Sequence, residues 1–121
     1  MKKLSVALCG VALLMSVPLL AFSQDIQAGK KVFKDNDCAS CHGDDAKSST
    51  SPEYPILAGQ HRDYLIHALK SYQRGKAGAP ASSNIRDNAI MGGMAESLSA
   101  EDIRNVAAWL ASLESPLGVR R

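Results

Sequence analysis

Cys38, Cys41 and His42 form the feature that most constrains this chain. Two cysteines two residues apart, with a histidine directly after the second, form the attachment signature of a c-type haem. The thiols add to the two vinyl groups on one porphyrin edge, and the adjacent histidine then reaches the iron as an axial ligand. The pattern therefore predicts one covalently bound haem c, with Cys38 and Cys41 as thioether positions and His42 as an iron ligand.

Two other kinds of site also use closely spaced cysteines. A thioredoxin-type dithiol lies beside a strand–helix unit, and a four-ligand zinc site needs a second pair of Cys or His ligands. The sequence offers neither context around Cys38 and Cys41. Haem attachment is the interpretation that these residues favour.

Residues 1–23 have the pattern of a secretory signal peptide. Lys2 and Lys3 precede an apolar run over residues 6–15, and small residues suit cleavage after Ser23. We therefore expect export to the periplasm. Export agrees with the haem motif, because covalent haem c is assembled outside the cytoplasm.

A retained membrane anchor is the alternative for this segment. The apolar run is shorter than a membrane-spanning helix, and Pro18 interrupts it, so we expect no stable membrane insertion after cleavage. The expected mature domain is residues 24–121. Loss of Lys2 and Lys3 reduces the 14 basic residues to the level of the 12 acidic ones, and nothing in this balance indicates a nucleic-acid partner.

Three helices are predicted around the motif. The first begins after the N-cap Asp25 and has one apolar face. The second is expected from about Arg62 to Arg74, with Gly75 as its stop signal. The third begins after the N-cap Ser99, and Pro116 is expected to end it. No alternation typical of strands is present.

The segments between these helices are expected to be irregular. Residues 43–51 are small and polar and indicate a surface loop, and residues 75–89 indicate a second loop that leads to Met91 and Met94. The apolar stretch 54–59 is too short for a regular element but suits one wall of a prosthetic group. Aromatic residues make up only 5% of the chain, so the porphyrin is expected to supply apolar bulk.

This ordered set of features resembles the class I bacterial cytochromes c, and especially one domain of the two-haem periplasmic cytochromes. The resemblance covers nearly all of residues 25–114. It rests on Gly29 with Phe33, the motif followed by Gly43, residues 54–60, Tyr64-Leu65, a methionine loop at Met91–Met94, Leu98-Ser99, and residues 106–110.

The resemblance implies an all-α class I cytochrome c fold, with three to five helices wrapped around the haem. In that family the first and last helices cross, so Gly29 and Phe33 are expected to meet Val106 and Trp109. Cytochromes of the four-helix-bundle type carry the motif near the C-terminus instead. Here most of the chain follows His42, which argues against a bundle.

Met91 matches the family's second axial ligand, and a His/Met pair suits electron transfer. Met94 is the alternative, although a methionine near a haem often only fills space. Ligation by a second histidine would need His61 or His67, and both are expected on the surface.

Four further residues are candidates for the surroundings of the haem. The resemblance implies that the carbonyl of Pro55 accepts the ring N–H of His42 and so orients the imidazole. Tyr54, Tyr72 and Arg86 are candidates to reach the haem propionates, and surface or core roles are equally open for them.

The expected function is that of a soluble electron carrier whose iron cycles between Fe(II) and Fe(III), without enzyme activity. Its expected partners are an electron donor and an electron acceptor protein, including a terminal oxidase or a dehydrogenase. One alternative is a haem subunit of a larger periplasmic dehydrogenase or oxidase complex. A second is a catalytic or gas-binding haem protein with a labile distal site.

Overall fold

The computed structural model describes residues 25–116, and these residues form helices and loops without any strand. The regular elements are α1 (Ile26–Asp35), α2 (Ala39–His42), α3 (Arg62–Lys76), the short 3₁₀ helix η1 (Ala81–Ser83), α4 (Ala89–Glu96) and α5 (Ala100–Ser112). The expected all-α fold is confirmed. The expected signal peptide at residues 1–23 lies outside the described residues. None of the helices within 25–116 has the length and apolar character needed to span a membrane.

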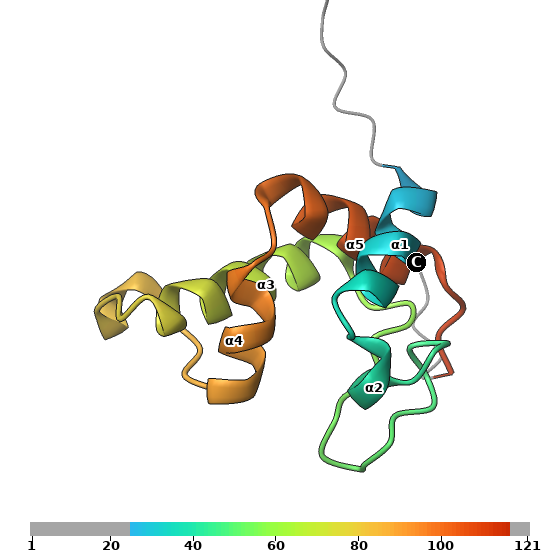
Figure 1. The fold of residues 1–121 in the computed structure, drawn as a ribbon, viewed down its shortest axis with the longest axis horizontal. Helices are drawn as coiled ribbons and strands as arrows, with labels where there is room; N and C mark the ends of the chain where they lie inside the picture. The colour runs from blue at the N-terminus through green and yellow to red at the C-terminus, as the bar shows by residue number, and fades with distance from the viewer. Residues whose placement is uncertain (1–24, 117–121) are drawn as a thin grey trace, which may run out of the picture.

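Helices α1 and α5 cross closely and form the centre of the core (Figure 1). A Cβ on Gly29 would lie 2.0 Å from the carbonyl oxygen of Asn105 and 2.8 Å from Trp109 Cβ, so glycine permits the close approach. The rings of Phe33 and Trp109 lie 4.9 Å apart between centroids, with 53° between their planes. Val106 belongs to the same core cluster, and the predicted crossing is confirmed.

Side-chain caps begin both helices of this crossing. Asp25 accepts hydrogen bonds from the backbone N–H groups of Gln27 and Ala28 at the start of α1. Ser99 and Asp102 form a reciprocal capping box at the start of α5. The prediction that Pro116 ends α5 is wrong, because the chain is already extended at Leu113, with φ −75° and ψ 148°.

Helix α3 is longer than its sequence signals predicted. It continues through Gly75 to Lys76 and ends in a Schellman motif, with Gly78 at φ +71°. The prediction that Gly75 stops the helix is therefore wrong. Gly75 is needed within the helix because a Cβ there would lie 2.2 Å from the carbonyl oxygen of Arg86.

The segment expected to be a methionine loop is helical. Helix α4 begins after Asn88, whose side chain accepts a hydrogen bond from the Met91 N–H, 2.8 Å away. Gly92 and Gly93 weaken the helical signal in the sequence, but Gly92 is buried where α4 lies beside α3 (Figure 1). The expected loop 75–89 is also interrupted by η1.

Residues 43–61 connect the motif to α3 without a regular element, as expected, but they do not all lie at the surface. Ala46 has no exposed surface, and its carbonyl oxygen accepts hydrogen bonds from the N–H groups of Leu57 and Ala58. The expected surface loop 43–51 is therefore fastened to the apolar stretch 54–59 at Ala46.

Candidate functional site

The Cys38–His42 motif lies on one short helical turn. Cys38 precedes α2, and its carbonyl oxygen accepts the N–H of His42 at 3.0 Å. Gly43 ends the turn with φ +77°, a conformation that glycine adopts at low cost. The two cysteine side chains and the imidazole therefore project from one hydrogen-bonded turn of the backbone.

The two cysteines of the motif are available for attachment. Cys38 and Cys41 form no disulfide and are both half-buried. Burial raises the pKa of the Cys38 thiol, whereas a thioredoxin-type nucleophile needs a lowered pKa. No group of three or more His, Cys, Asp or Glu side chains within residues 25–116 converges as a metal site, so the arrangement is unlike that of structural zinc.

His42 is buried and held by one hydrogen bond. Its exposed fraction is 5%, and Nδ1 lies 3.0 Å from the carbonyl oxygen of Pro55. Because a carbonyl only accepts, Nδ1 is the donor, and a neutral ring then has its lone pair on Nε2. The contact is the one that the resemblance implies for Pro55. It leaves Nε2 as the nitrogen that can bind a metal.

Tyr54 lies between the motif and the apolar stretch. Its ring centroid is 6.2 Å from that of His42, and the charge of the neighbouring Cys41 side chain raises the pKa of Tyr54. Tyr54 therefore lies beside the motif, whereas Tyr72 lies on α3 beside Arg86.

Met91 and Met94 both lie on α4 and are both half-buried. They are three residues apart in a helix, so they share one side of it. The hydrogen bond to Asn88 ties the backbone of Met91 to the cap. Sequence reasoning missed the role of Asn88, although an Asn directly before an apolar segment is an N-cap signal.

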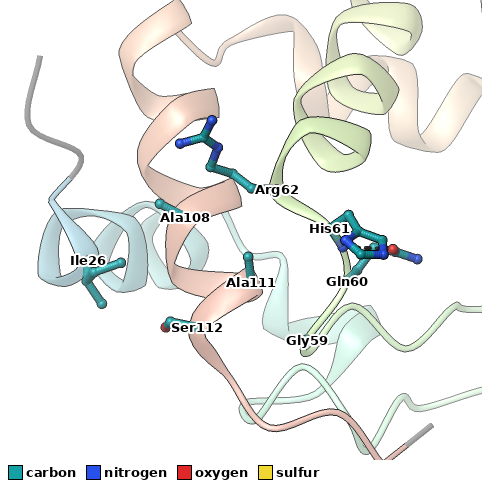
Figure 2. A pocket seen from close by; sticks show the side chains of 8 residues that line it. All are labelled: Ile26, Gly59, Gln60, His61, Arg62, Ala108, Ala111 and Ser112. Carbon is teal, nitrogen blue, oxygen red and sulfur yellow. Dashed lines mark hydrogen bonds between the residues drawn. The ribbon is translucent and has the colours of Figure 1, made fainter. Parts of the chain in front are cut away.

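The two other histidines are on the surface. His67 is exposed on α3, and His61 is exposed directly before it. His61 lines a shallow pocket of 380 Å³ between α5, the start of α1 and the loop before α3 (Figure 2). Figure 2 shows Ala108 and Ala111 on the α5 side of this pocket. None of the expected haem ligands lines it.

Arg86 contacts two tyrosines of α3. Its Nη2 donates to Tyr64 Oη at 3.0 Å, and its guanidinium carbon lies 5.3 Å and 5.5 Å from the ring centroids of Tyr64 and Tyr72. Sequence reasoning singled out Arg86 and Tyr72 but did not place them together, and it used Tyr64 only for the family resemblance. No periodicity links a loop arginine to a helix, so only the tertiary structure reveals the cluster.

Comparison with known proteins identifies the family. Residues 26–114 match the cytochrome c family. The chain belongs to the cytochrome c family. It is a class I c-type cytochrome, in agreement with the resemblance found in its sequence.

Named relatives agree with this membership. The chain is 40% identical over 78 residues to cytochrome c-554(548) of Halomonas halodenitrificans, covering 64% of this chain and 84% of that protein. It is 37% identical over 82 residues to cytochrome c4 of Azotobacter vinelandii, covering 67% of this chain and 38% of that protein. The crystal structure of reduced cytochrome c4 from Pseudomonas stutzeri matches with a TM-score of 0.64 and 35% identity, covering 76% of this chain and 47% of that one. The chain thus spans less than half the length of these cytochromes c4 and resembles one domain of a two-haem cytochrome.

Membership of the cytochrome c family implies covalently bound haem c. The residues present fit such a group. Cys38 and Cys41 are thiols outside any disulfide, and His42 keeps Nε2 available while Pro55 holds Nδ1. Met91 adds a half-buried thioether, a soft ligand suited to iron in an electron-transfer site.

Proposed function

We propose that the chain is a periplasmic electron carrier with one covalently bound haem c, whose iron is ligated by His42 and Met91. The observation that carries the proposal is the hydrogen bond from His42 Nδ1 to the Pro55 carbonyl. It orients the ring and keeps the Nε2 lone pair available for a metal. The haem supplies the one-electron exchange between Fe(II) and Fe(III), while the chain supplies ligands, orientation and burial.

Cys38 and Cys41 are the proposed thioether positions, and Met91 is the proposed second axial ligand. A neutral thioether stabilises Fe(II) relative to Fe(III), which raises the reduction potential. Two retained axial ligands leave no position on the iron for a substrate. We therefore expect no enzyme activity, and the proposed partners are an electron donor and an electron acceptor protein.

The proposed location follows from the expected signal peptide at residues 1–23. Cleavage after Ser23 would release residues 24–121 as the mature domain. The proposed domain contains the whole of the family match, which begins at residue 26. Export would also place Cys38 and Cys41 where covalent haem attachment occurs.

Attachment is tested with the exported protein and its Cys38→Ser and Cys41→Ser variants. Haem should stay with the wild-type polypeptide during extraction with acidified acetone, because thioether bonds are covalent. Each serine variant should lose one bond, which changes the absorption maximum of the pyridine complex of the haem. Extraction of haem from the wild-type protein would contradict the proposed linkage.

Axial ligation is tested by comparing Met91→Ala with the matched variant Met94→Ala. Met91→Ala should open the sixth position, so that the reduced protein binds carbon monoxide and its potential falls. Met94→Ala should keep the low-spin spectrum and bind carbon monoxide no faster than wild type. The opposite result would assign the iron ligand to Met94.

A further inference from the structure

The segment that precedes α4 is fastened to α3 through its backbone. The N–H of Arg86 donates to the carbonyl oxygen of Ser71 at 3.0 Å. The carbonyl oxygen of Arg86 occupies the space where a Cβ on Gly75 would lie, 2.2 Å away. This part of the chain is thus held against one turn of α3, five residues before Met91.

A second arginine supports the same segment from within α3. Nη2 of Arg74 donates to the carbonyl oxygen of Asn84 at 2.8 Å and to Ser71 Oγ at 2.9 Å. Ser71 is buried and its hydroxyl donates to the carbonyl oxygen of His67 at 2.7 Å. Both ends of the short stretch from Asn84 to Arg86 are therefore attached to α3.

The side chain of Arg86 adds a further attachment. Its guanidinium donates to Tyr64 Oη at 3.0 Å and lies over the rings of Tyr64 and Tyr72. Among the described residues no carboxylate forms an ion pair with Arg86. The charge is stabilised by a phenol oxygen and two aromatic faces instead.

The attachment is transmitted to Met91 through Asn88. The side chain of Asn88 accepts the N–H of Met91 at 2.8 Å, and its carbonyl oxygen accepts the N–H of Gly92 at 2.8 Å. Asp87 alone separates Arg86 from Asn88. The position of Met91 is therefore set by a short, hydrogen-bonded path that begins on α3.

We infer that Arg86 is a positioning residue, which holds Met91 on the iron by fastening the start of α4 to Tyr64 and Tyr72. The inference rests on the proposed ligation by Met91. Release of Arg86 would let the first turn of α4 move away from α3. The protein would then spend a larger fraction of time with the sixth iron position open.

The experiment measures carbon monoxide binding to the reduced holoprotein, because the rate reports how often Met91 leaves the iron. Arg86→Met removes the charge and keeps an apolar stem. It should speed carbon monoxide binding by up to about tenfold, the factor that a hydrogen bond of a charged group contributes to the opening equilibrium. Lys70→Met is the matched control, because it removes an equal charge from an exposed position on α3, and its rate should equal that of wild type.

Two further variants keep the test decisive if Arg86→Met does not fold. Tyr64→Phe removes only the phenol oxygen from an exposed side chain, and Gly75→Ala displaces the Arg86 backbone without altering the guanidinium. Both should speed carbon monoxide binding, whereas Arg86→Lys should partly restore the slow rate.

The two proposals fail in different ways. If the Arg86, Tyr64 and Gly75 variants bind carbon monoxide as slowly as wild type does, Arg86 has only a structural role, even where the melting temperature falls. If wild type binds carbon monoxide as fast as Met91→Ala, the ligation by Met91 fails, and the role of Arg86 fails with it.

Discussion

At the α1–α5 crossing, side chains of the protein fill the interior, whereas the α3–α4 pair buries few side chains and relies more on polar contacts. Helix α5 is buried without interruption from Asn105 to Leu110, while α4 buries only Gly92 and Ala95. Gln73 of α3 spans the second region, since its Nε2 donates to the carbonyl oxygens of Ala95 and Leu98 at 2.9 Å and 2.8 Å.

The difference shows where the protein's own side chains pack most completely against one another. The rings of Phe33 and Trp109 pack against each other at the crossing. The backbones approach so closely at Gly29 that no space remains there for a side chain. On the α3–α4 side, Met91 and Met94 remain half-buried and Ile90 is 60% exposed. Under the proposed function, the haem is the apolar body against which that side packs.

The largest predicted effect is at the crossing. Gly29→Ala should lower the free energy of unfolding by about 3 kcal/mol, because the added Cβ meets backbone atoms of Asn105 that cannot rotate away. Gly93→Ala is the matched control on α4, where a Cβ meets nothing within 4 Å. It should be neutral or stabilising by up to about 1 kcal/mol, from helix propensity. Urea unfolding of the holoproteins measures both, and equal effects would contradict the contrast between the regions.

A smaller effect is predicted at Gln73, whose side chain hydrogen-bonds α3 to the carbonyl oxygens of Ala95 and Leu98. Gln73→Leu should lower the free energy of unfolding by about 1–2 kcal/mol, because the carbonyl oxygen of Leu98 loses its side-chain donor. Gln27→Leu, at an exposed position on α1, should change stability by less than about 0.5 kcal/mol. If both variants unfold at the same urea concentration, the hydrogen bonds of Gln73 do not join the two elements.

The smallest effect is predicted in the loop after the motif. The N–H of Ser48, the N–H of Lys47 and the Ser48 hydroxyl lower the pKa of Asp45 from 3.8 to about 2. A lowered pKa in the folded state adds stability above pH 3.8, which is lost as the pH falls through about 2. The Asp45→Asn variant should therefore have a lower free energy of unfolding than wild type at neutral pH, and this difference should disappear near pH 2. Carboxyl NMR titration measures the pKa directly, and an unshifted value would contradict the role of the loop hydrogen bonds.

Much of the crossing could be predicted from the sequence, because its signals are local. Asp25 and Ser99 are side-chain caps, and the apolar spacing that contains Phe33 and Trp109 repeats at helical period. Their meeting followed from the family resemblance. Covalent haem attachment at Cys38, Cys41 and His42 could also be predicted from the sequence, because the motif is local and characteristic of a c-type haem.

The α3–α4 side was harder to predict because distant contacts decide it. Gly75 has the appearance of a helix stop, yet it lies within α3 to admit the backbone of Arg86. Gly92 and Gly93 suggest a loop, yet the cap from Asn88 and the contact with α3 keep them helical. The buried Ala46 was missed for the same reason, because its neighbours in the sequence are either polar or glycine and contain no apolar side chain.

A redox titration of the mature holoprotein with visible spectra tests the central claim most directly. One haem ligated by His42 and Met91 predicts a single one-electron transition, with a six-coordinate low-spin spectrum in both oxidation states and only slow binding of carbon monoxide by the reduced form. A high-spin spectrum, or rapid binding of carbon monoxide, would contradict the proposal of a closed electron carrier.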